Sequence, residues 1–261
     1  MARSLRPLVI GNWKMNLDHV EAVHLTQQLG VLLRATPAEH ADVALAPPFV
    51  DLRSVSSVVE SERMPVAVTA QHVNPHDSGA HTGEVSVAML RRLGVTSVIV
   101  GHSERRQNYA MTDEVVAATL RAVGVGGLAP VLCVGEDLEL REAGRHESHV
   151  RAQLESAVAG LEARVPETLS VAYEPIWAIG TGVSATTEEV RAMTAFVRAT
   201  LGALGFADSR VLYGGSVNAD TAAELASAGG VDGFLVGGAS LRADSFFAIV
   251  QATSGCYAGQ R

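Results

Sequence analysis

Residues 169–204 read LSVAYEPIWAIGTGVSATTEEVRAMTAFVRATLGAL. The run 169–172 is short and apolar, which predicts a buried strand. Thr186 and Glu189 match a capping box, the signature of a helix N terminus. The apolar residues after it recur on one helical face, namely Val190, Met193, Val197, Leu201 and Leu204. The segment therefore predicts one strand, a glycine-containing loop and one amphipathic helix.

Similar apolar runs recur along the chain at an average spacing of roughly thirty residues, the length of one strand with its crossover helix. The eight runs are 8–10, 43–45, 66–68, 98–100, 131–134, 169–172, 211–213 and 234–236. A second helical face is predicted at Val150, Leu154, Val158, Leu161 and Val165. Eight similar units favour a single (β/α)8 barrel of the α/β class over an open sheet. No linker interrupts them, so residues 1–261 are predicted to form one domain, with a poorly ordered tail after Ala252.

Composition excludes several kinds of partner. The 261 residues carry a net charge of −8 without a cluster of basic residues, which argues against nucleic acid and anionic membranes. The N-terminal apolar run 8–10 is too short for a signal peptide, and the longest uncharged stretch, 122–135, contains glycines and a proline. We therefore expect a cytoplasmic protein that does not span a membrane. Cys133 and Cys256 form no CxxC pair and are expected to remain reduced.

Polar residues and glycines directly follow most of the predicted strands. They are Asn12, Lys14, Gln71, His102, Glu104, Glu136, Glu174, the segment 214–216, and the pair Gly237 and Gly238. The C-terminal ends of barrel strands share one rim, so these residues are expected to line one pocket.

Three of these residues indicate a reaction. Glu174 follows an apolar strand, where desolvation would suit it to act as a general base, although a surface carboxylate is the alternative. His102 could equally be a buried structural histidine. Lys14 is the only lysine among the 20 basic residues, which suggests chemistry that needs a compact ammonium. A carboxylate, an imidazole and an ammonium without a metal motif suit proton abstraction beside a carbonyl and stabilisation of the enediolate.

The glycines suggest the ligand. Residues 214–216 and the pair Gly237 and Gly238 follow the seventh and eighth strands, where exposed backbone N–H groups often bind phosphate in barrels. Glycine pairs often serve only turns, but two pairs on neighbouring strands strengthen this interpretation. Residues 175–182 begin with proline and end with glycines, as expected of a hinged lid.

Five motifs together resemble the triosephosphate isomerase family in order and spacing, over almost the whole chain. They are GNWKMN at 11–16, GHSERR at 101–106, YEPIWAIGTG at 173–182, YGGS at 213–216 and LVGGAS at 235–240. The resemblance implies a TIM barrel that interconverts dihydroxyacetone phosphate and D-glyceraldehyde 3-phosphate through an enediolate, in glycolysis and gluconeogenesis, with no cofactor and no metal.

The resemblance also implies a role for each matching residue. Glu174 would be the base and neutral His102 the electrophile, while Asn12 and Lys14 bind substrate and stabilise its charge, with Glu104 positioning Lys14. The implied phosphate site consists of Gly180, Ser216, Gly237 and Gly238. The implied lid consists of Pro175, Ile176, Trp177, Ala178, Ile179, Gly180 and Thr181, and Val183 stands at a hinge position where the family usually has lysine.

Residues 71–84 resemble the arm that enters the neighbouring subunit in this family, with Thr82 approaching the partner's active site. A homodimer is therefore implied. His72 replaces the family's usual asparagine, and His81 replaces its usual aromatic residue. The arm histidines fit no standard zinc spacing, so no metal site is predicted.

Two other functions remain open from sequence. A metal-dependent barrel aldolase would need histidines at several strand ends, whereas only His102 occupies one, and chelator sensitivity would reveal it. A catalytically inactive barrel serving as a binding module would be expected to lack at least one of Asn12, Lys14, His102 and Glu174, and all four are present.

Overall fold

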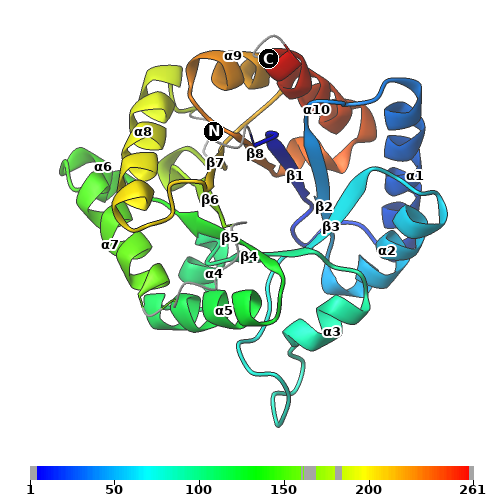
Figure 1. The fold of residues 1–261 in the computed structure, drawn as a ribbon, viewed down its shortest axis with the longest axis horizontal. Helices are drawn as coiled ribbons and strands as arrows, with labels where there is room; N and C mark the ends of the chain where they lie inside the picture. The colour runs from blue at the N-terminus through cyan, green and yellow to red at the C-terminus, as the bar shows by residue number, and fades with distance from the viewer. Residues whose placement is uncertain (1–4, 160, 162–168, 180–183, 259–261) are drawn as a thin grey trace.

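The chain folds into a closed parallel barrel. The computed structural model describes residues 5–159, 161, 169–179 and 184–258. Its strands follow each other around the barrel in sequence order, and the last pairs with the first (Figure 1). They are β1 (Leu8–Asn12), β2 (Asp42–Ala46), β3 (Val66–Ala70), β4 (Ser97–Val100), β5 (Ala129–Val134), β6 (Ser170–Tyr173), β7 (Arg210–Tyr213) and β8 (Gly233–Val236). The predicted (β/α)8 barrel is confirmed.

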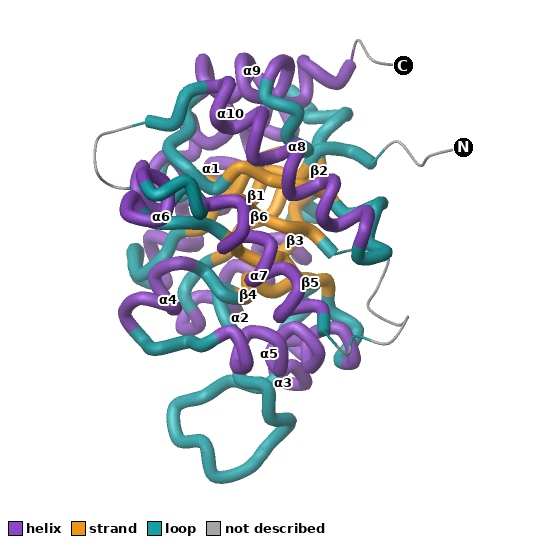
Figure 2. The backbone as a smooth tube through the Cα atoms, turned by 90° about the vertical axis from the view of Figure 1, so that its left-hand side faces the viewer, coloured by secondary structure: helices purple, strands orange, loops and turns teal. Residues whose placement is uncertain are grey.

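Helices surround the strands, as Figure 2 shows from the side. They are α1 (His19–Ala35), α2 (Leu52–Ser61), α3 (Val87–Arg92), α4 (Ser103–Asn108), α5 (Asp113–Val125), α6 (Leu138–Glu142), α7 (His146–Val158), α8 (Thr187–Ala203), α9 (Ala219–Ala228) and α10 (Ala243–Ala258), with 3-10 turns η1 (Phe49–Asp51), η2 (Ile176–Ala178) and η3 (Gly238–Leu241). Within the described residues, none of these helices has the length and apolarity to span a bilayer.

The capping box predicted for α8 is present. The Thr186 side chain accepts the N–H of Glu189, and the Glu189 carboxylate accepts the N–H of Thr186. These contacts satisfy two N–H groups that a helix start otherwise leaves unpaired. The predicted apolar face is buried at Val190, Met193, Val197 and Leu201. The predicted helix is therefore confirmed, while Leu204, the last residue of the predicted face, follows the helix and is only partly buried.

Alternation along the strands divides the apolar residues between two cores. One fills the barrel interior and consists of Ile10, Ala44, Ala46, Ile99, Val131, Cys133, Ala172, Leu212 and Leu235. The other and larger core lies between the strands and the helices. Both cysteines are free. These side chains fill the barrel interior, so a ligand is expected outside this inner core, and in barrels the C-terminal ends of the strands are the usual place.

Two sequence predictions were wrong or only partly right. The chain after Ala252 is not a loose tail, because α10 continues to Ala258. Thr253 and Ser254 are buried there, and Tyr257 donates a hydrogen bond to the carbonyl of Val231 at 2.6 Å. The face predicted to extend from Val150 holds only to Val158, where α7 ends. Leu161 lies beyond the helix, and Val165 is outside the described residues.

The segment 71–86 between β3 and α3 projects from the barrel as a long arm (Figures 1 and 2). A single bridge between Asn74 and Ser86 joins its two ends. The side chains of Asn74 and Glu84 also form a hydrogen bond of 2.9 Å. The base of the arm is therefore held together, while its tip points away from the barrel.

Candidate active site

The C-terminal ends of the strands surround a cavity of about 330 Å³. Asn12, Lys14, His102 and Glu174 line it, although the first and last are 162 residues apart. The remaining wall comes from Ile179 and from the loops after β7 and β8, namely residues 214–217 and 235–239. The structure thus brings together most of the residues that the sequence placed at strand ends, whereas Gln71, Glu104 and Glu136 do not line this cavity.

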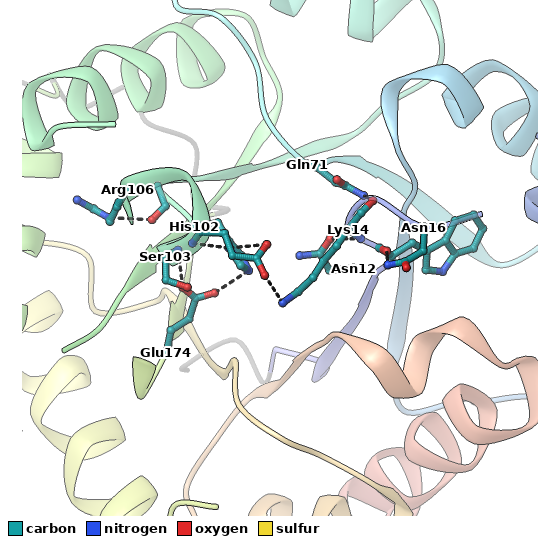
Figure 3. Close-up of polar contacts among 11 residues, drawn as sticks. Asn12, Lys14, Asn16, Gln71, His102, Ser103, Arg106 and Glu174 are labelled. Atoms are coloured by element: carbon teal, nitrogen blue, oxygen red, sulfur yellow. Dashed lines mark hydrogen bonds and ion pairs between the residues drawn. The ribbon is translucent and has the colours of Figure 1, made fainter. Parts of the chain in front are cut away.

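Lys14 is held in an uncommon backbone conformation. Its φ is +53°, a region that costs a non-glycine residue free energy and is found mainly at functional sites. Its N–H donates to Asn12 Oδ1 at 3.1 Å, and its carbonyl accepts from Gln71 Nε2 at 2.8 Å. The ammonium reaches Glu104 Oε1 at 2.6 Å (Figure 3). Both ends of Lys14 are therefore fixed, and its charge is directed across the cavity.

His102 precedes α4 and caps it. Its Nδ1 accepts the backbone N–H of Glu104 at 3.2 Å. Because Nδ1 accepts this hydrogen bond, Nε2 is the ring nitrogen left to donate one. Nε2 lies 3.2 Å from Glu174 Oε1 (Figure 3). The imidazole thus presents an N–H donor to the cavity.

The Glu174 carboxylate is only 2% exposed. Its Oε2 accepts the backbone N–H of Ser103 at 2.9 Å. Its Oε1 contacts His102 Nε2 at 3.2 Å. Burial and the nearby Glu174 carboxylate raise the pKa of the Cys133 thiol below it, so this cysteine stays protonated. A desolvated carboxylate beside an imidazole at a cavity is suited to accept a proton.

The loops after β7 and β8 offer backbone donors. No described group accepts a backbone hydrogen bond from the N–H of Ser216, Gly237 or Gly238. Gly215 leaves no space for a side chain, because a Cβ there would lie 2.2 Å from the Tyr213 hydroxyl. Free N–H groups around a small cavity are typical of phosphate sites. Gly180, which the resemblance assigns to the same site, lies outside the described residues.

Glu136 anchors the start of the predicted lid. This fully buried carboxylate accepts hydrogen bonds of 2.9 Å from both the Tyr173 hydroxyl and Trp177 Nε1. Arg141 contacts Glu136 at 3.5 Å, and its guanidinium lies over the Trp177 ring, 5.4 Å from the ring centroid. Burial and the Glu136 charge raise the pKa of Tyr173. Trp177 belongs to η2, whereas Thr181 and Val183 are outside the described residues.

The arm contains one buried and two exposed histidines. Burial, with a further contribution from the nearby Arg105 charge, lowers the pKa of His72 to about 4. The rings of His76 and His81 stack at 4.4 Å, and both residues are exposed, as is Thr82. In the described ranges, no three His, Cys, Asp or Glu side chains gather where they could hold a metal ion.

Several supporting contacts were not found from sequence. The N–H of Ser103 and the side chain of Arg106, which donates to the carbonyl of Gly101 at 2.8 Å, hold the segment that carries His102. Gln71 was predicted to lie at a strand end. The two hydrogen bonds that its Nε2 donates, to the carbonyls of Lys14 and Ala46, were not predicted. Backbone donors leave no signal in residue type, and only the GHSERR motif could have directed attention to Ser103 and Arg106.

Comparisons with known proteins agree with one another. A model of the triosephosphate isomerase family matches residues 7–253. A triosephosphate isomerase of Rhodococcus jostii is 47% identical over 250 residues, which cover 94% of this chain and 95% of the relative. Those of Streptomyces avermitilis and Saccharopolyspora erythraea are 46% and 48% identical, over 95% and 94% of this chain and 98% and 95% of the relatives.

Proposed function

Because the chain belongs to the triosephosphate isomerase family, and is therefore an isomerase, we propose that it interconverts dihydroxyacetone phosphate and D-glyceraldehyde 3-phosphate with the residues gathered at the barrel rim. The observation that carries the proposal is the Glu174 carboxylate. It is buried, its Oε1 lies 3.2 Å from His102 Nε2, and both residues line a cavity that Lys14 also lines.

Glu174 is the base in this proposal. Its carboxylate takes the proton from one carbon of the substrate, leaving an enediolate, and returns it to the neighbouring carbon. Its oxygen Oε2 is bound to the Ser103 N–H in the ligand-free chain, so the side chain must shift toward the substrate to react. Burial keeps bulk water away from the carboxylate and from the carbon that it deprotonates.

His102 and Lys14 stabilise the charge that develops on the substrate oxygens. The Nε2–H of His102 donates to the carbonyl oxygen as it becomes negative, and the same ring moves protons between the two oxygens. The Lys14 ammonium supplies positive charge, and Asn12, which binds the Lys14 N–H, lies beside it. Glu104 holds the ammonium in place through its 2.6 Å contact.

The phosphate group is assigned to the backbone N–H groups of Ser216, Gly237 and Gly238, together with Gly180. This arrangement explains how a chain of net charge −8 binds a dianion, because the attraction is local. Residues 175–181 are proposed to close over the substrate. Closure would release or remodel the Trp177 contact with Glu136.

We also assign the arm to a homodimer contact and the protein to the cytoplasm. The arm extends beyond the barrel with Thr82 exposed near its tip. Met15, next to Lys14, is 91% exposed, and Val50 of η1 is 80% exposed. Large apolar side chains so exposed, one of them next to Lys14 in the sequence, support burial by a second copy of the chain.

A coupled assay of isomerisation tests the proposed activity. We expect turnover in both directions that a chelator does not change. Absence of isomerisation in folded protein would overturn the proposal, and loss of activity on chelation would favour a metal-dependent reaction instead.

A further inference from the structure

A second cavity lies on the outside of the barrel, where α2 and α3 flank β3. Its volume is about 420 Å³, within the range of small-molecule sites. It shares no lining residue with the candidate active site. Its walls are Arg53, Ser56, Val59 and Glu60 of α2, Val66, Ala67 and Val68 of β3, Arg91 and Arg92 of α3, and the following Leu93, Gly94 and Thr96.

The cavity gathers most of the unpaired arginines. Among the described residues, the guanidinium groups without a hydrogen bond, ion pair or ring contact are those of Arg53, Arg63, Arg91 and Arg92. All but Arg63 line the cavity. Basic residues are common at a helix C terminus, so Arg91 and Arg92 alone would indicate little. Arg53, however, comes from a different helix. None of the three arginines forms an ion pair with a described carboxylate, although the chain has more acidic than basic residues.

Ser56 provides a second and independent observation. It lines the cavity and is 7% exposed, and its hydroxyl has no hydrogen-bond partner in the described structure. Its neighbour Ser57 donates to the carbonyl of Arg53 at 2.8 Å, as helical serines commonly do. A buried hydroxyl without a partner costs free energy unless something else supplies one. A ligand oxygen in the cavity would do so.

We propose that this cavity binds a small organic phosphate. The planar guanidinium forks of Arg53, Arg91 and Arg92 match phosphoryl oxygens, and Ser56 adds a neutral donor. Val59, Val66 and Leu93 give an apolar wall for the carbon skeleton of the ligand. The Glu60 carboxylate can accept a hydrogen bond from a ligand hydroxyl, and its negative charge would repel a ligand that carries only anionic groups. The combination fits a nucleoside monophosphate better than inorganic phosphate.

Calorimetric titration with AMP tests this site. We expect a dissociation constant below about 1 mM, weakened about tenfold or more in Arg53→Gln/Arg92→Gln. Arg63→Gln is the control, because it removes one arginine charge just beyond α2, and Arg63 does not line the cavity. It should change binding less than about twofold. Ser56→Ala should weaken the binding of AMP. It should not lower the melting temperature, because the Ser56 hydroxyl has no hydrogen-bond partner within the described protein to lose.

Isomerase kinetics separate the two cavities. Both arginine variants should keep the KM and kcat of the parent chain, because none of the altered residues lines the candidate active site. Equal AMP affinity in the parent and the double variant would overturn the proposal, as would no binding at several millimolar. Binding of inorganic phosphate as tight as that of AMP would show that only an adventitious anion is held.

Discussion

The Oε2 atom of Glu174 accepts the backbone N–H of Ser103 at 2.9 Å, which joins the end of β6 to the start of α4. This contact places the carboxylate beside His102, whose Nε2 lies 3.2 Å from the other oxygen, Oε1. The site thus depends on backbone geometry as well as on side chains. Small changes near Glu174 should therefore reduce activity while leaving the fold intact.

Gly214→Ala should show this sensitivity. An alanine Cβ would lie 3.0 Å from Glu174 Cγ, so the carboxylate must shift by a few tenths of an ångström or more. Misplacement of a catalytic group can cost on the order of 10²-fold in turnover. Gly202→Ala in α8 is the control, since its Cβ meets nothing within 4 Å and alanine favours a helix. Parent-like kcat in Gly214→Ala would show that the position of Glu174 is not critical.

Lys14→Arg should lose most activity although it keeps the charge. The ammonium lies 2.6 Å from Glu104, and a larger forked guanidinium cannot occupy that position without displacing its neighbours. We expect a loss of about 10²-fold in kcat/KM. An active Arg variant would show that position 14 supplies only positive potential.

Chemical labelling checks Lys14 without mutation. Lys14 is the only lysine, so an amine-specific reagent can modify only its ammonium and the α-amino group. A saturating phosphate-bearing substrate analogue should protect Lys14 and leave the terminus reactive. Peptide mass spectrometry measures both sites, and an unchanged rate at Lys14 would place it outside the occupied cavity.

The fold could be predicted from sequence because periodicity and capping report directly on local structure. The α8 unit was located from Thr186, Glu189 and its apolar face. The tail was misjudged because α10 is stabilised by distant contacts, such as Tyr257 with the Val231 carbonyl, that no local pattern reveals. The strand-end residues were found because topology alone brings them to one rim. The Ser103 N–H and the left-handed backbone of Lys14 depend on three-dimensional geometry, so they could not be found that way.

Stability should fall with acid because of His72. The pKa of His72 is about 4 in the folded chain and about 6.5 in the unfolded chain. As pH falls, the unfolded state therefore takes up the proton at a higher pH than the folded state does. The neutral form's contribution is complete above pH 6.5 and is lost as pH falls from there toward 4, at up to about 1.4 kcal/mol per pH unit. Denaturant unfolding at several pH values measures this slope. His72→Asn should reduce it, and an unchanged slope would contradict a buried neutral His72.

Tryptophan fluorescence should report lid movement. Trp13 is fully buried, whereas Trp177 is bound to Glu136 and covered by Arg141. In Trp13→Phe the emission comes from Trp177 alone, because these are the only two tryptophans. A saturating substrate analogue should change that emission. Constant emission on binding would argue against movement of Trp177.

Steady-state kinetics of Glu174→Gln test the proposed base most directly. Glutamine keeps the shape of the side chain and an oxygen that can accept the Ser103 N–H, so the fold and melting temperature should be retained. It cannot take a proton from carbon, and general-base catalysis contributes about 10²- to 10⁴-fold. We predict a fall in kcat of at least about 10²-fold. A folded Glu174→Gln variant with nearly full isomerase activity would contradict the assignment of Glu174 as the base.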